Sequence, residues 1–167
     1  MRIAGFLRGC AQGARGDVQP GVMVERYEAY AGAERTLRIL VVDDDGVDRL
    51  ALRRALAHTG MAPEVTEADA VLAAIGLLTA EAFDCVFLDY NLPDGDGLTF
   101  LRGLRAAGIE IPVVMLTGQQ DDRVAAQLGE SGAVDYVDKA ELTSARMVES
   151  LRRALPGRLA QPTPRTA

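Results

Sequence analysis

Hydrophobic segments that end directly in polar, chemistry-bearing residues recur along this chain. Segment 39–42 is followed by Asp43 and Asp44, segment 85–88 by Asp89, and segment 113–116 by Thr117. A fourth segment, 136–138, leads to Lys139. In an open parallel sheet the carboxyl ends of the strands lie along one edge, and ligands bind in the crevice outside that edge. The pattern therefore predicts that carboxylates, a hydroxyl and an ammonium group meet in one pocket.

Strand and helix patterns alternate regularly from residue 37 onward. Apolar runs predict strands over 38–42, 63–67, 84–88, 112–116 and 134–137, and apolar residues at a 3.6-residue period predict helices over 47–59, 69–79, 97–107, 121–130 and 144–155. We expect Asp69 to cap the second helix and the strand 63–67 to lie near an edge, because proline suits strand starts. Five βα units of this kind predict an α/β fold, a doubly wound five-stranded parallel sheet with flavodoxin-like (βα)5 order.

The two ends of the chain differ from this alternating region. Residues 1–36 are rich in Gly, Ala and Arg without a sustained period, so we expect a flexible extension, and Met23 is an alternative start. Residues 37–155 form the predicted domain, and residues 156–167, with Pro162 and Pro164, predict a disordered tail. This division leaves no room for an output domain.

Composition restricts the partners and the compartment. The formal net charge of −6 gives no electrostatic footprint for nucleic acid. No apolar run approaches the roughly 18 residues that a membrane span needs. Cys10 and Cys85 do not form a disulfide framework, which fits a reducing, cytoplasmic environment. We therefore expect neither nucleic acid nor membrane as a partner.

The predicted pocket has the chemistry of phosphoryl transfer. Clustered carboxylates such as Asp43, Asp44 and Asp89 repel one another, and a hard divalent cation removes that cost. Mg²⁺ prefers a few carboxylates, water and phosphate oxygens, so a phosphoryl group can complete its coordination shell. One carboxylate can then act as the nucleophile, while Lys139 and Thr117 stabilise charge on the transferred group.

The segments ILVVDDD, VFLDYNLPDGDGL, VVMLTG and DYVDK resemble the receiver domain of bacterial two-component response regulators, over roughly residues 37–155. The resemblance implies that the chain accepts a phosphoryl group from a histidine kinase or a histidine phosphotransfer protein, and that it is not an enzyme beyond self-catalysed phosphotransfer and autodephosphorylation. It also implies a role for each matching residue: Asp89 as phospho-acceptor, Asp43, Asp44 and Asp89 as Mg²⁺ ligands with the backbone carbonyl of Asn91, Thr117 and Lys139 on the phosphoryl group, and Tyr136 as the aromatic switch.

Two features depart from the family pattern. The family usually has a proline after the lysine, where a cis peptide shapes the loop, but this chain has Ala140. A cis bond before a non-proline residue costs about 2.5–4 kcal/mol, so either the strain is held or this loop differs. The second departure is the missing effector domain. A stand-alone receiver would signal through the face formed by residues 121–155 to a downstream protein or to a second copy of itself.

Two other functions remain open. Residues 43–47 also resemble the first motif of haloacid dehalogenase-like phosphatases, with Asp43 as nucleophile, Asp45 as general acid, and Thr117 and Lys139 in the second and third motifs. No acidic strand end follows Lys139, however, and Asp89 would have no role. A phosphorylation-independent binding module is the other alternative.

Two further residues have simple structural interpretations, and two others would lie beside the reacting group. We interpret Asp45 as a solvated helix-start residue and His58 as a surface residue at a helix end. Asn91 and Gln119 would flank the path of an attacking water, and both side chains are neutral amides that make poor general bases.

Overall fold

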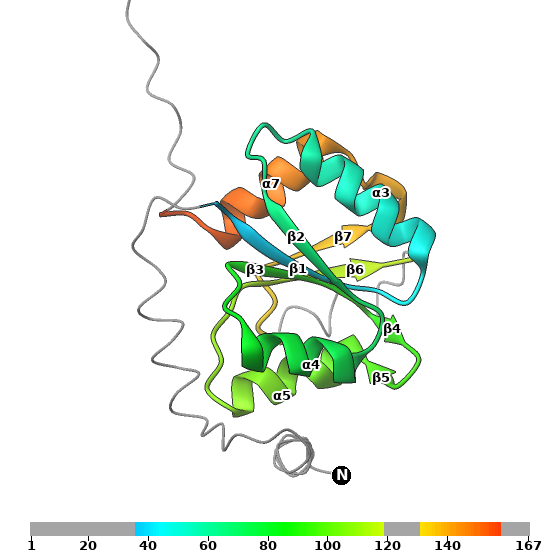
Figure 1. The fold of residues 1–167 in the computed structure, drawn as a ribbon, viewed down its shortest axis with the longest axis vertical. Coiled ribbons are helices and arrows are strands. Elements are labelled where there is room, and N and C mark those ends of the chain that lie inside the picture. Colours follow the sequence, from blue (N-terminus) through cyan, green and yellow to red (C-terminus); the bar gives the residue numbers. More distant parts are fainter. Residues whose placement is uncertain (1–35, 119–130, 158–167) are drawn as a thin grey trace, which may run out of the picture.

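A five-stranded parallel sheet forms the centre of the computed structural model, which describes residues 36–118 and 131–157 (Figure 1). The strand order is β2-β1-β3-β6-β7, and every neighbouring pair is parallel. This is the predicted doubly wound order. The strands are β1 (Arg38–Val42), β2 (Glu64–Ala68), β3 (Cys85–Asp89), β6 (Val113–Thr117) and β7 (Asp135–Asp138).

Helices cover both faces of this sheet. Figure 1 shows α3 (Gly46–Ala57) and α7 (Ser144–Ala154) on one face, and α4 (Val71–Ala80) and α5 (Gly97–Ala106) on the other. Two short strands, β4 (Asn91–Leu92) and β5 (Gly95–Asp96), form a hairpin after β3, and a 3₁₀ turn, η1 (Lys139–Glu141), follows β7. The predicted helix over 121–130, Gln119, most of the extension 1–36 and most of the tail 156–167 lie outside the described residues.

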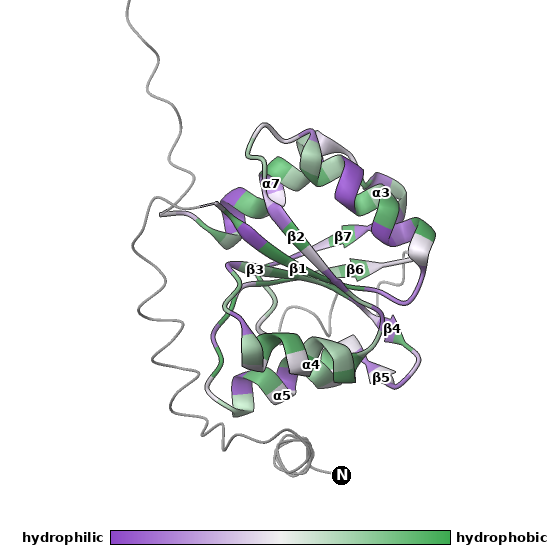
Figure 2. Cartoon of the chain, in the orientation of Figure 1, coloured by the Kyte–Doolittle hydropathy of each residue, from purple (hydrophilic) through white to green (hydrophobic). Residues whose placement is uncertain are grey.

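Burial explains which strands are central. In β1 and β3 almost every side chain is buried, and Figure 2 shows these strands as mostly hydrophobic. Helices on both faces require such uninterrupted apolar sequences. In β2, by contrast, Glu64 and Glu67 are exposed. This strand lies at the edge of the sheet, as predicted from Pro63.

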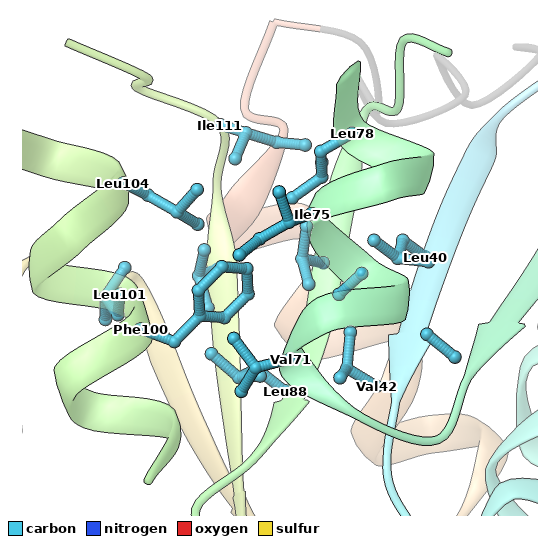
Figure 3. Packing of buried hydrophobic residues seen from close by; sticks show 14 of the residues in the cluster. Leu40, Val42, Val71, Ile75, Leu78, Leu88, Phe100, Leu101, Leu104 and Ile111 are labelled. Atoms are coloured by element: carbon cyan, nitrogen blue, oxygen red, sulfur yellow. The ribbon is translucent and has the colours of Figure 1, made fainter. Parts of the chain in front are cut away.

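Two hydrophobic clusters fill the space between the sheet and its helices. Phe100 and Leu101 of α5 and Ile75 of α4 pack against Leu88 of β3 in the cluster drawn in Figure 3. The second cluster, on the other face, joins Leu52 and Leu56 of α3 to Met147 and Leu151 of α7. The central strands β1, β3 and β6 supply both clusters, because successive side chains of a strand point to opposite faces of the sheet.

The start of α4 differs from the prediction. Asp69 does not cap this helix: the residue at the cap position is Ala70, whose side chain cannot accept a hydrogen bond. Instead, the carboxylate of Asp94 accepts hydrogen bonds from the backbone amides of Val71 (2.8 Å) and Leu72 (3.0 Å). Asp94 lies in the β4–β5 turn, so the helix is capped from 23 residues away in sequence. A local sequence pattern cannot reveal such a cap.

The start of α5 requires glycine at position 97. The Gly97 amide donates to the carbonyl of Tyr90 (2.8 Å), and a Cβ atom built on Gly97 would lie 2.2 Å from the backbone oxygen of Asp89. A real side chain cannot approach a carbonyl oxygen so closely, so any other residue would push α5 away from the end of β3. This contact holds the hairpin after Asp89 against the sheet.

Other boundaries agree with the predictions within one or two residues. The side chain of Asp45 caps α3, Asp96 caps α5 and Thr143 caps α7. The exposed His58 ends α3, and its Nδ1 atom lies 2.7 Å from the carbonyl oxygen of Arg54. Asp45 and His58 therefore take the simple structural roles expected of them. Within the described ranges, none of the helices has the length and apolar character needed to span a membrane.

The remote cap of α4 makes a quantitative prediction. Asp94→Ala removes the only side-chain acceptor found for the first amides of α4, and we expect it to lower the free energy of unfolding by about 1 kcal/mol. Asp69→Ala, at the exposed position predicted from sequence, should change it by less than about 0.5 kcal/mol. Urea denaturation of both variants measures the difference. Equal losses would show that the Asp94 contact does not stabilise the helix.

Candidate functional site

Three carboxylates gather at the carboxyl edge of the sheet. Asp43 follows β1 directly and Asp89 is the last residue of β3, and both are buried, whereas Asp44 is exposed. One carboxylate oxygen from each residue lies within 4.8 Å of the others. The strand-end pattern of the sequence therefore does bring these three side chains together.

Strand register explains the convergence. Val42 pairs with Leu88 across β1 and β3, so the next residue of each strand, Asp43 and Asp89, ends at the same level. Thr117 is the last residue of β6 and pairs with Asp138, the residue before Lys139. Thr117 is partly buried, and a Cβ atom on the next residue, Gly118, would meet none of the described residues within 4 Å.

Lys139 is the centre of the site. Its Nζ atom lies 2.7 Å from Asp43 Oδ2, 2.9 Å from Asp48 Oδ2 and 3.0 Å from Asp89 Oδ2. Of the 18 lysine and arginine residues in the sequence, Lys139 is the only lysine. A compact ammonium with three rotatable donors can serve three separate carboxylates, whereas the planar arginine fork is shaped for one.

The charges of this cluster shift one another's pKa values. Burial raises the pKa of Asp89, Lys139 opposes this effect, and the negative charge of Asp43 reinforces it, with a net rise. Burial alone would lower the pKa of Lys139, but its contacts with Asp43, Asp48 and Asp89 outweigh burial and raise it. One ammonium therefore does not neutralise the carboxylates around it, and the ionised form of Asp89 remains costly.

The residues present fit a divalent cation. Asp43 Oδ1 accepts a hydrogen bond from the amide of Asp45 (2.8 Å). The Oδ2 atom of Asp43 is buried and accepts no hydrogen bond in the described part of the chain, although it is close enough to Lys139 for an ion pair. This buried oxygen has unused acceptor capacity and lies next to the carboxylates of Asp44 and Asp89. Together the three carboxylates form a set of metal ligands made only of oxygen atoms. Such sets suit Mg²⁺.

Two residues of the site were missed by the sequence analysis, and both come from the first turn of α3. Asp48 contacts Lys139, and the guanidinium of Arg49 donates to the backbone carbonyl of Asp43 (2.7 Å) and to Glu67 (3.0 Å). The Arg49 contacts fix the end of β1 relative to the start of the helix. The available signal was the position of 46–49 as the first turn of the helix after β1, which faces the same pocket.

The two remaining predicted positions lie at the rim. Asn91 is exposed in the β4–β5 hairpin, and its backbone acts to lower the pKa of Asp89 against the larger effect of burial. Tyr136, the predicted switch residue, is three residues before Lys139, and 48% of its surface is exposed. Its backbone carbonyl accepts a hydrogen bond from Arg146 of α7 (2.7 Å).

The loop after Lys139 differs from the usual family geometry. No cis peptide occurs among the described residues, so the bond from Lys139 to Ala140 is trans. The Ala140 amide donates to the carboxylate of Asp138 (2.8 Å), which caps the η1 turn. Proline has no amide hydrogen and could not make this bond. Of the two possibilities left open by Ala140, the structure therefore has the different loop and not the strained one.

Comparisons with known proteins agree with this fold. Residues 39–152 match the response regulator receiver domain family. Over 125 residues, 72% of this chain, the sequence is 38% identical to response regulator MprA of Mycolicibacterium vanbaalenii and 40% identical to response regulator MprA of Mycobacterium sp. (strain KMS). Those regions are 52% and 53% of the two relatives, so the chain spans about half the length of the curated relatives it matches.

Solved structures give the same result. NtrX from Brucella abortus superimposes with a TM-score of 0.65 at 30% identity, over 73% of this chain and 27% of that one. A putative response regulator from Chloroflexus aurantiacus superimposes with a TM-score of 0.66 at 27% identity, over 73% of this chain and 99% of that one. This chain belongs to the family of response regulator receiver domains, the signalling domains of bacterial two-component systems.

Proposed function

We propose that this receiver domain accepts a phosphoryl group on Asp89, in a Mg²⁺-dependent reaction, from a histidine kinase or a histidine phosphotransfer protein in the cytoplasm. The observation that carries the proposal is the contact of one ammonium, Lys139, with both Asp43 and Asp89 in a buried pocket at the sheet edge. That arrangement supplies a nucleophile together with a cationic group that can pair with a phosphoryl oxygen.

In the proposed reaction a carboxylate oxygen of Asp89 attacks phosphorus and the phosphorus–nitrogen bond of the donor histidine breaks. Asp43, Asp44 and Asp89 would hold Mg²⁺, together with the backbone carbonyl of Asn91. The bound ion offsets negative charge on the phosphoryl oxygens. Lys139 and the hydroxyl of Thr117 contact those oxygens. Water later attacks phosphorus, the bond to Asp89 breaks, and inorganic phosphate leaves with the carboxylate restored.

The pKa of Asp89 suits this role only with its neighbours in place. Burial raises that pKa and so disfavours the ionised, nucleophilic form, while the hydrogen bond and charge of Lys139 favour it. A cation at the three carboxylates would act in the same direction as Lys139. The charges of Lys139, the acceptor Asp89 and the cation therefore depend on one another. The domain is itself the substrate of the reaction, because its own Asp89 receives the phosphoryl group.

The output of the phosphorylated domain would pass through the surface beside Lys139. Phosphate on Asp89 would draw the Thr117 hydroxyl inward, and the exposed ring of Tyr136 could then move toward the space it leaves. Of that surface, β7 and α7 lie in the described residues, and Arg146 ties them together through Asp135 and the Tyr136 carbonyl. The partner of this face is a downstream protein or a second copy of the chain.

Cation binding tests the metal part of the proposal. Mg²⁺ should raise the melting temperature, because a ligand at about 100 times its dissociation constant stabilises the folded state by about 2.7 kcal/mol. Asp44→Asn should weaken Mg²⁺ binding at least about tenfold, as measured by isothermal titration calorimetry. Asp45→Asn is the matched control, since Asp45 caps α3 and lies outside the carboxylate cluster. Equal affinities of the two variants would contradict the assignment.

Phosphorylation tests the acceptor. Incubation with Mg²⁺ and acetyl phosphate should add a single phosphoryl group to one carboxylate. Intact-mass spectrometry should show this as a gain of about 80 Da, the mass of one phosphoryl group. Asp89→Asn should abolish this gain, and Asp45→Asn should retain it. Label on Asp43 in the Asp89 variant would favour the phosphatase alternative. Absence of label on the wild-type protein would favour the binding module.

Hydrogen exchange tests the output face. With Mg²⁺ and beryllofluoride, a stable phosphoryl mimic, amide protection should change in peptides from β7 and α7 and stay constant in peptides from α4. The Asp89→Asn variant should show no change in either. Sedimentation velocity under the same conditions reports association with a second copy. If protection and mass are unchanged in the wild-type protein, the domain is a phosphate relay or sink and not a conformational switch.

A further inference from the structure

Lys139 has one carboxylate partner that no metal or phosphoryl chemistry explains. Asp48 lies in the first turn of α3, and its Oδ2 atom is 2.9 Å from the ammonium. It does not belong to the group of carboxylates that could share a cation, which consists of Asp43, Asp44 and Asp89. One donor of the ammonium is therefore committed to a side chain outside the reacting group.

The partners of Lys139 differ in what a cation would do to them. Asp43 and Asp89 would share their oxygens with Mg²⁺, and this weakens their hold on the ammonium. Asp48 would keep its full negative charge for Lys139. Its side chain is 34% exposed, against 1% for Asp43 and 5% for Asp89. Asp48 is therefore the partner of Lys139 that is open to solvent, and we call its position the mouth of the pocket.

We propose that Asp48 is a positioning residue that holds the Lys139 ammonium at the mouth of the pocket and competes for it with the phosphoryl group on Asp89. The competition with the phosphoryl group rests on the proposed function of Asp89. The hold on Lys139 does not depend on that function. Two consequences follow from the contact. The unphosphorylated pocket keeps its lysine in place when a cation is bound, and an incoming phosphodonor must take the ammonium away from a carboxylate.

A purely structural role for Asp48 makes different predictions. A carboxylate in the first turn of a helix also stabilises the helix through the macrodipole. Asp45, three residues earlier and also at the start of α3, shares that effect and the same net charge, but it accepts from the amide of Val47 and not from Lys139. Asp45→Asn is therefore the matched control for Asp48→Asn. Asp48→Glu is the rescue variant, because it restores the carboxylate.

The hold on Lys139 can be measured without phosphorylation, because the chain has a single lysine side chain. The rate of acetylation of Lys139, relative to the α-amine, reports how firmly its carboxylate partners hold the ammonium. Asp48→Asn removes one of the three contacts and should raise this rate about threefold to tenfold. Asp45→Asn should leave it within about twofold, and Asp48→Glu should restore the wild-type rate. Equal rates in Asp48→Asn and Asp45→Asn would overturn the hold.

Competition is measured by the rate of phosphorylation with Mg²⁺ and acetyl phosphate. Asp48→Asn should react about threefold faster than Asp45→Asn at 0.5 M salt, where repulsion between separated charges is screened and the direct contact is not. An equal or slower rate in Asp48→Asn would overturn competition. If the wild-type protein is not phosphorylated, both the proposed function of Asp89 and the competition by Asp48 are overturned. The acetylation rates still decide whether Asp48 holds the lysine.

Discussion

The ion contacts of Lys139 connect most of the elements that build the site. The residue follows β7, and its ammonium contacts the carboxylates that end β1 and β3 and a third from α3. The buried carboxylates of Asp43 and Asp89 repel each other, and the ammonium that contacts both of them offsets this repulsion. The packed sheet brings the strand ends together, and Lys139 makes their proximity tolerable.

The segment after Asp89 is held by contacts from three directions. The amide of Tyr90 donates to Leu116 of β6 (3.0 Å), Gly97 lies against the carbonyl of Asp89, and the carboxylate of Asp94 accepts from the first amides of α4. A site on a loop is usually less well defined than one on a strand. Here the loop is fixed at its start, its tip and its end, so Asp89 and the Asn91 backbone are presented in a defined position.

The sheet order and the acidic cluster were predictable because each depends on strong, local signals. Apolar runs without polar interruption identify buried parallel strands, and parallel order places their ends, including Asp43, Asp89 and Thr117, at one edge. Asp94 and Asp48 were missed because their partners, Val71 and Lys139, lie 23 and 91 residues away in sequence. Capping preferences apply to the residues next to the helix start in sequence, so they cannot identify a carboxylate that caps the helix from another loop.

The electrostatics of the pocket link these observations. Asp43, Asp48 and Asp89 contact a single ammonium, and Asp44 lies beside Asp43 and Asp89. The unphosphorylated site therefore carries more negative than positive charge, and this excess contributes to the raised pKa of Asp89. A divalent cation would lower that excess, and a phosphoryl group would restore it. Each step in the proposed cycle therefore changes how strongly the carboxylates compete for Lys139. A side chain outside the reacting group, such as Asp48, can alter the balance without touching the phosphoryl group, because Asp43, Asp48 and Asp89 all contact the same ammonium.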